Sequence, residues 1–341
     1  MKQSSKTAAR ILAGIDVGAT ELLVALQRDG QPEPIRTLPN TPAGHRTLIK
    51  LLTRRGAHAR VCLEATGVYS LRLALALHRA ERVEVMVVNP RAIKDFQRAR
   101  LCRAKTDGVD ALGILEFLLR MDFVPWTPPA DAVLALQQLG RRLVQLRGEL
   151  TREEARLHAI AYTPDRDGLI AADLNTNIRH LKKRIKALHL AALELAGNDP
   201  QLAPLVARFC SVPGIGKASA LRLLGELLVL PADLKAPQWV AHAGLDPRPR
   251  QSGQKDAPRH ISRTGNRHLR HALFMPALVA IQRCPQIRAC YEALLARGKK
   301  KKVAIIAIMR RLLHALWGML RHQQDFDPQL FHPLPTTAAH A

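Results

Sequence analysis

Hydrophobic residues recur with two different periods along the first third of the chain. Four short apolar runs have the character of strands: 11–17, 21–27, 59–65 and 82–88. A turn at Gly18 joins the first two, so we expect them to form a hairpin. Helical periodicity follows the third run at 70–78 and the fourth over most of 89–120. Strands interleaved with helices predict an α/β sheet layer here.

The pattern changes after residue 123. Three prolines interrupt 124–131 and mark a domain boundary. Two runs with apolar residues spaced alternately by three and four then flank a turn at 162–168, which predicts a helical hairpin that packs as a coiled coil. Two ordinary core helices are the alternative, because Glu153 occupies one of the apolar positions. The apolar positions are Leu136, Leu139, Leu143, Leu146, Leu150, Leu157, Ile160, Ile178, Leu181, Ile185, Leu188, Ala192 and Leu195.

Beyond residue 198 the pattern predicts a second globular region that is mostly helical. The tail after His322 is rich in proline and histidine and is expected to fray. The fold class is therefore α/β followed by α. The predicted divisions are 1–126 for the α/β domain, 127–198 for the helical hairpin, 199–322 for the helical domain and 323–341 for the tail.

The charge balance points to the kind of partner. The 341 residues include 52 Lys and Arg against 28 Asp and Glu, a formal net charge of +24. So large an excess favours a polyanion, most often nucleic acid. No uninterrupted apolar run reaches the roughly 18–20 residues that span a bilayer, so we expect no membrane. Five cysteines without a CxxC pair, and an N-terminus without a cleavage site, favour a prokaryotic cytoplasm close to the nucleoid.

Four carboxylates stand out by position. Asp16 ends the first strand and Glu64 ends the third, while Asp107 and Asp110 lie three residues apart on one face of a helix. Clustered carboxylates repel one another, and such a cluster persists when cations occupy it. Mg²⁺ prefers hard oxygen ligands, and two such ions stabilise phosphoryl transfer. The four residues therefore predict a metal site, although each alone could be a cap or turn residue.

A glycine motif opens a helix in the second globular region. The stretch 212–227 contains Gly214 and Gly216 directly before Lys217. Backbone N–H groups at such a turn hold phosphate without reading sequence. The pattern is like the hairpin of a helix-hairpin-helix motif, and a plain helix-entry turn is the alternative.

A basic segment, 243–273, contains seven Arg or Lys residues and three His. Arg267 and Arg270 begin a helix at a spacing suited to phosphate contact. Ser252 is flanked by glycine and basic side chains, which would stabilise both an alkoxide and a phosphoryl transition state. A serine beside glycine is also a common turn residue. Ser262, ten residues further on, has an equally basic setting, so the residues alone leave both serines as candidates.

Several of these stretches together resemble the "one-ten" family of bacterial insertion-sequence transposases over roughly residues 11–320. The motifs that carry the resemblance are GIDVGAT, CLEATGVY, VVNPRAIKDFQRARLCRAKTDGVDA, PGIGKASA and GLDPRPRQSGQKDAPRHISRTGNRHLRHAL. The resemblance implies an RNase H-like, RuvC-like domain followed by a transposase domain. It also implies a dimer or tetramer that assembles through the helical hairpin, and a structured non-coding RNA that pairs with donor and target DNA.

The resemblance also implies roles for single residues. Asp16, Glu64, Asp107 and Asp110 match the family's DEDD quartet, which holds Mg²⁺, with Mn²⁺ as a substitute. Ser252 matches the nucleophile that forms a phosphoserine link to DNA, and the serine of one protomer meets the carboxylates of another. The residues expected to contact nucleic acid are Lys105, Gly214, Gly216, Lys217, Arg248, Arg250, Lys255, Arg259, Arg263, Arg267 and Arg270.

Three other functions fit part of the sequence. A RuvC-like junction nuclease would use the carboxylates alone and leave Ser252 idle. A catalytically idle protein would only bind nucleic acid. A sugar kinase or actin-like ATPase would share the first phosphate loop, GIDVGAT, but we find no second phosphate loop or adenosine motif, and the net charge does not suit a small-metabolite kinase.

Overall fold

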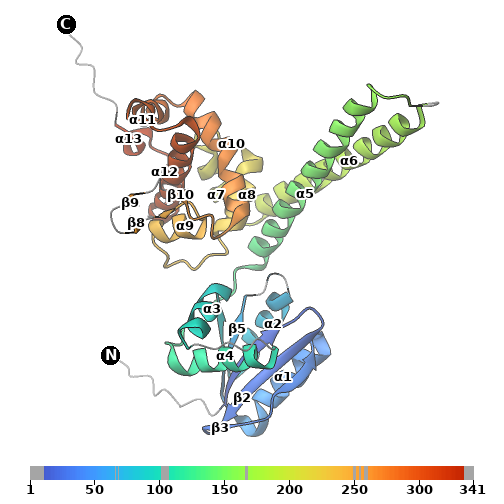
Figure 1. Ribbon diagram of the computed structural model, residues 1–341, viewed down its shortest axis with the longest axis vertical. Coiled ribbons are helices and arrows are strands. Elements are labelled where there is room, and N and C mark those ends of the chain that lie inside the picture. The colour runs from blue at the N-terminus through green and yellow to red at the C-terminus, as the bar shows by residue number, and fades with distance from the viewer. Residues whose placement is uncertain are drawn as a thin grey trace. The chain divides into compact units, whose positions relative to one another are not determined.

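The computed structural model describes residues 11–65, 67, 69–100, 107–165, 168–248, 251–252, 255–256 and 260–333. At 107, 109, 251–252 and 255–256 the description covers the backbone only. The chain divides into two compact units, 1–128 and 129–341. Each unit is considered by itself (Figure 1).

The first unit is built on a six-stranded sheet with the order β3-β2-β1-β5-β6, in which β4 also pairs with β2. The hairpin of β1 and β2 is antiparallel, whereas β1 pairs parallel with β5, and β5 parallel with β6. The strands are β1 (Ile11–Val17), β2 (Glu21–Arg28), β3 (Gln31–Pro32), β4 (Arg36–Pro39), β5 (Ala59–Glu64) and β6 (Val83–Val88). All four strands predicted from the sequence are confirmed.

Helices cover both faces of this sheet, because successive strand residues point to opposite sides. The odd-numbered residues of β1 from Ile11 to Val17 pack with α1 and α2, while Leu12 faces α4. The helices are α1 (Pro42–Leu52), α2 (Tyr69–His78), α3 (Pro90–Ala99) and α4 (Asp107–Arg120), with a 3-10 turn, η1 (Arg54–Gly56).

The second unit begins with two long helices that pack along each other, α5 (Asp131–Ile160) and α6 (Leu169–Asn198) (Figure 1). Every apolar position predicted for the seam is buried or half-buried, and Leu136, Leu146 and Leu181 are among the buried ones. Glu153 is accommodated because Arg156 lies 2.6 Å from its carboxylate. The helical hairpin is therefore confirmed, whereas its use as an oligomerising coiled coil stays a prediction.

The rest of the second unit is mostly helical, as predicted, with one hydrophobic core. Its helices are α7 (Leu202–Cys210), α8 (Lys217–Leu227), α9 (Ala236–His242), α10 (Arg267–Arg283), α11 (Pro285–Ala296), α12 (Lys301–His322) and α13 (Pro328–Phe331). Four two-residue strands lie between α9 and α10: β7 (Pro247–Arg248), β8 (Gln251–Ser252), β9 (Lys255–Asp256) and β10 (His260–Ile261).

Among the described residues, one helix is long and apolar enough to cross a membrane by length and composition, and that helix is α12. The sequence analysis did not anticipate it, because Arg310 and Arg311 interrupt the apolar run. Ile308, Leu312 and Leu316 on this helix belong to the core of the second unit. Its apolar face is therefore used for packing within the chain.

Candidate active site

Asp16 and Glu64 lie at the same end of two neighbouring parallel strands. The register pairs Ile15 with Leu63, so Asp16 and Glu64 are the next residues along each strand. Both side chains fall on the sheet face that α4 covers, because Leu12 and Cys62, at even spacings from them, pack with the helices on that face. The strand pairing alone thus brings two of the four predicted carboxylates together.

Helix α4 brings the other two residues to the same strand ends. It crosses β1 so closely at Gly14 that a Cβ there would lie 2.2 Å from the backbone nitrogen of Leu115. This contact places the first turn of α4, with Asp107 and Asp110, next to the end of β1. The Asp107 backbone begins the helix, and its side chain lies outside the described residues. Gln97 Nε2 on α3 donates to Asp110 Oδ1 at 3.2 Å.

The carboxylates are close enough to affect one another electrostatically. The pKa of Glu64 is raised, chiefly by burial and further by the negative charges of Asp16 and Asp110. A cation placed among these groups would have the opposite effect on that pKa, because it favours the charged form. All the candidate ligand atoms are carboxylate oxygens, which are the hard ligands that Mg²⁺ prefers. Within the described residues no three acidic, His or Cys side chains already form a metal-binding group. Asp107 would be the fourth ligand.

Ser252 lies in one of two short antiparallel strand pairs between α9 and α10, which we together call the ribbon. The outer pair of strands, β7 and β10, matches Arg248 with His260 and Pro247 with Ile261. The inner pair, β8 and β9, matches Ser252 with Lys255. Only the backbone of Ser252 is described.

Ser262 occupies a different position, at the base of the ribbon. Here the chain at 242–246 is hydrogen-bonded to 262–266, and we call this region the neck. Ser262 Oγ donates to Asp246 Oδ1 at 2.5 Å, and its backbone N–H donates to the carbonyl of Asp246 at 2.9 Å. The hydroxyl is thus engaged in holding the two ends of the ribbon together. This structural role accounts for the Ser262 hydroxyl within the fold.

The residues predicted to contact nucleic acid differ in their exposure and in whether they already have a structural role in the fold. Arg248, Arg263, Arg267, Gly216 and Lys217 are exposed, and Gly216 and Lys217 begin α8. Lys105, Arg250 and Arg259 lie outside the described residues, and Lys255 is described by its backbone alone.

Two of these residues have structural roles. Arg270 Nη1 donates to the carbonyl of Ala243 at 2.8 Å. Gly214 has a φ of +95° and faces α10, where a Cβ would lie 2.6 Å from the carbonyl oxygen of Pro276. Packing against α10 therefore accounts for the glycine at 214 without a phosphate.

A buried carboxylate that the sequence analysis missed lies near the ribbon. Glu226 on α8 is only 4% exposed, and Arg141 on α5 binds it through Nε at 2.7 Å and Nη2 at 2.9 Å. Asn266 Nδ2 donates to the same carboxylate at 2.7 Å, and Gln137 Nε2 does so at 3.3 Å. The only signal in the sequence was the single acid of α8, and a lone acid on a helix is a common surface pattern.

The pH dependence of stability should report on Glu226. Burial would raise its pKa, but hydrogen bonds from Arg141 and Asn266 outweigh that effect and hold the pKa below its ordinary value of 4.5. The stabilisation is then fully present above about pH 4.5 and is lost as the pH falls through the lowered native value. We expect Glu226→Gln to lower the free energy of unfolding by about 1–3 kcal/mol at pH 7, measured by urea denaturation.

The difference between wild type and Glu226→Gln should shrink when the same denaturation is repeated below pH 4.5. Below that pH, wild type loses the stabilisation that the ionised Glu226 carboxylate provides, whereas the variant has no carboxylate at this position. A difference that stays constant down to pH 3 would show that the ionised carboxylate is not what stabilises this contact.

A second missed feature is a stripe of four cations on α6. Arg179, Lys182, Lys183 and Lys186 share one exposed face of the helix, opposite the apolar seam. Lys182 lies 3.0 Å from Glu154, and no acidic residue occurs on α6 between Asp173 and Glu194. The stripe offers positive charge to a polyanion along about two turns of helix.

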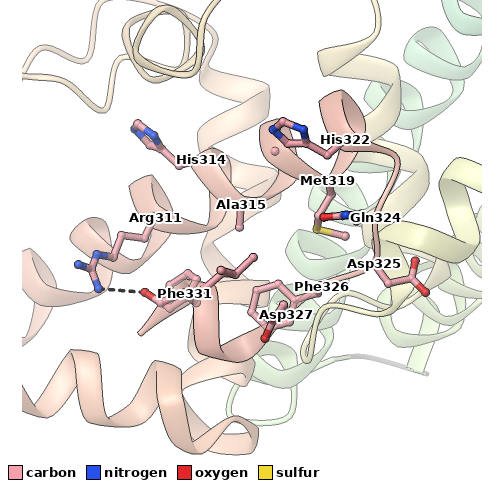
Figure 2. A pocket seen from close by; sticks show the side chains of 12 residues that line it. Arg311, His314, Ala315, Met319, His322, Gln324, Asp325, Phe326, Asp327 and Phe331 are labelled. Atoms are coloured by element: carbon pink, nitrogen blue, oxygen red, sulfur yellow. Dashed lines mark hydrogen bonds between the residues drawn. The ribbon is translucent and has the colours of Figure 1, made fainter. Parts of the chain in front are cut away.

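A cavity of about 550 Å³ lies elsewhere in the second unit, between α12 and the segment that follows it (Figure 2). Arg311, His314 and His322 come from α12, while Phe326 and Phe331 form the facing wall. Arg311 Nη1 donates to the carbonyl of Phe331 at 3.4 Å. None of the predicted site residues lines this cavity.

Comparison with known proteins gives matches in both the N-terminal and the C-terminal parts of the chain. A model of IS110-type DEDD transposases matches residues 13–161, and a model of the Transposase IS116/IS110/IS902 family matches residues 206–292. The pilin gene-inverting protein of Moraxella lacunata is 31% identical over 79% of this chain and 82% of its own length. An uncharacterized 44.8 kDa protein of insertion element IS116 from Streptomyces clavuligerus is 26% identical over 96% of this chain and 97% of its own length.

The α/β unit with its acidic strand ends and these matches define an enzyme that recombines DNA. The chain belongs to the IS110 family of insertion-sequence transposases, so the resemblance inferred from the sequence is confirmed. DNA is accordingly its substrate. The match to a DEDD transposase model also indicates the use of a divalent metal ion in general terms.

Proposed function

We propose that this transposase cuts and rejoins DNA through a covalent phosphoserine link at Ser252, assisted by Mg²⁺ and guided by a structured non-coding RNA. Asp16, Glu64, Asp107 and Asp110 hold the metal, for which Mn²⁺ can substitute. The observation that carries the proposal is the convergence of Asp16, Glu64 and Asp110, where burial and the charges of Asp16 and Asp110 raise the pKa of Glu64. A cluster of repelling carboxylates suits a site that binds cations.

The chemistry conserves phosphodiester bonds. Ser252 Oγ loses its proton to a base and attacks the phosphorus, one bridging oxygen leaves as a strand-end hydroxyl, and a serine phosphodiester forms. A hydroxyl from another strand then attacks the same phosphorus and releases the serine. When bound, Mg²⁺ supplies charge neutralisation at the non-bridging oxygens. Arg248 and Arg263, both exposed near the ribbon, orient the phosphate, and no nucleotide cofactor is required.

The proposal assigns a role to each division of the chain. Residues 1–126 form the RuvC-like metal-binding domain, 127–198 the oligomerising hairpin, and 199–322 the transposase domain that carries Ser252 and a helix-hairpin-helix-like turn. The active form is a homodimer or homotetramer in the prokaryotic cytoplasm, at the nucleoid. The net charge of +24 and the cation stripe on α6 support contact with both RNA and DNA.

The inversion named in the Moraxella relative is consistent with a conservative recombinase. We expect the purified chain to join donor and target DNA only when Mg²⁺ and the non-coding RNA transcribed beside its gene are both present. The measurement is amplification across the new junctions, with EDTA and with an unrelated RNA of equal length as controls.

Two results of that assay would contradict the proposal. If DNA is joined without the RNA, the proposed guidance by RNA is wrong. Cleavage of branched DNA without joining would favour the junction nuclease.

A further inference from the structure

The ribbon that carries Ser252 is held at its neck by successive hydrogen bonds. The N–H groups of Ser262 and Arg263 donate to the carbonyls of Asp246 at 2.9 Å and Gly244 at 3.1 Å. One step further, the N–H of Asn266 donates to the carbonyl of His242 at 2.7 Å. The strands β7 and β10, which leave this neck, are therefore fixed in register.

Asn266 ends this series and is also the N-cap of α10. Its Oδ1 accepts from the N–H groups of His268 at 2.9 Å and Leu269 at 3.1 Å, while its Nδ2 donates to Glu226 at 2.7 Å. Both ends of the amide are thus used. A single residue therefore joins three parts: its backbone N–H contacts the neck of the ribbon, and its side chain contacts the start of α10 and the buried carboxylate on α8.

Glu226 in turn fastens this joint to the long hairpin. Arg141 on α5 approaches its two carboxylate oxygens side by side, and Gly225 lets α8 come so close that a Cβ there would lie 2.9 Å from the Gln137 Cα. The hydrogen-bonded path is Arg141, Glu226, Asn266 and then the neck. It connects α5 with the element that bears the serine.

Stability alone does not explain a buried ion pair at this position. Apolar residues of similar volume usually stabilise a fold as well as such a pair does, and the attested use of buried polar groups is to specify one geometry. The bidentate Arg141 contact and the two-sided use of Asn266 each fix direction as well as distance.

We propose that Asn266 and Glu226 are positioning residues that set the direction of the Ser252 ribbon relative to α5. The inference rests on the proposed role of Ser252 as nucleophile. In this arrangement Asn266 never touches DNA, and it acts through the backbone of the ribbon. Its loss should therefore slow attack by the serine without weakening the binding of DNA.

Asn266→Asp tests the proposal, because aspartate still caps α10 but places a second carboxylate against Glu226. We expect the rate of covalent adduct formation in a single turnover to fall about 10–100-fold, as for other small misplacements of a reacting group. The Kd for DNA, from fluorescence anisotropy, should not change. The double variant Glu226→Gln with Asn266→Asp again places a donor opposite an acceptor at this bond and should recover part of the rate, since the Gln amide nitrogen no longer accepts from Arg141 Nη2.

Asp199→Asn is the matched control. The Asp199 carboxylate accepts from the N–H groups of Gln201 and Leu202 just before α7, so the variant exchanges the same two residue types at a helix start with no hydrogen bond to the ribbon. Its adduct rate should equal that of wild type. If Asn266→Asp does not fold, Asn266→Gly removes the bond to Glu226 at little capping cost.

The outcomes separate this inference from the proposed function. If wild type forms no adduct at Ser252, the proposed function fails. If wild type forms the adduct and the Asn266 variants form it at the same rate per folded molecule, only the positioning role is overturned. A double variant that regains thermal stability but not adduct rate would overturn it as well.

Discussion

Ser252→Ala should abolish the covalent protein–DNA adduct and lower strand cleavage by at least about 10³-fold, the scale of losing a catalytic nucleophile. Ser252 lies in the two-residue strand β8, which pairs with β9, and the described residues of the hydrophobic core lie outside these two strands, so we expect removal of its hydroxyl to create no cavity in the core. The thermal midpoint should therefore stay at the wild-type value. The measurement is a denaturing gel of end-labelled DNA after a single turnover.

Ser262→Ala is the control for this prediction. Its Oγ is bonded to Asp246, so we expect the adduct to form in this variant, more slowly than in wild type because the neck is loosened. An adduct that persists in Ser252→Ala and disappears in Ser262→Ala would transfer the nucleophilic role to Ser262.

Asp16→Asn should have the second largest effect. Changes around a metal site that leave every ligand in place cost about 10–100-fold, so the loss of a central ligand should cost at least about 100-fold in Mg²⁺-dependent cleavage. Bound cations should also raise the thermal midpoint of wild type, because they bind the folded state and relieve the repulsion at Glu64. That rise should be absent in the variant.

Asp95→Asn serves as its control, since Asp95 is an exposed carboxylate on α3 that lies near Arg91 and Arg98. It should keep both the cleavage activity and the rise in thermal midpoint with Mg²⁺. Asp16→Asn retaining Mg²⁺-dependent cleavage would remove Asp16 from the metal site.

The hydrophobic pattern was enough to predict the four long strands, which are apolar runs largely buried on both faces of the sheet, and the helical hairpin, in which each helix buries one regular face. It gave no prediction for 29–58, where β3, β4 and α1 are formed. Four prolines in 31–42 interrupt any period there, and β3 and β4 are held by pairing with β2 rather than by burial of their own side chains. Short edge strands leave little trace in a single sequence.

The site shows the same division between local pattern and tertiary contact. The convergence of Asp16 and Glu64 followed from the expectation that neighbouring strands end together, and the strand register supports it. The link from Glu226 to Arg141 and Asn266 joins residues 85 and 40 positions apart. No periodicity relates such residues, so this contact could be found only in the folded chain.

The most direct test of the central claim is mass spectrometry of the protease-digested adduct from a wild-type reaction with Mg²⁺. The account predicts a nucleotide attached to Ser252 in the peptide that spans the ribbon. DNA cut to free ends with Ser252 unmodified, or a nucleotide attached to any other residue, would contradict it.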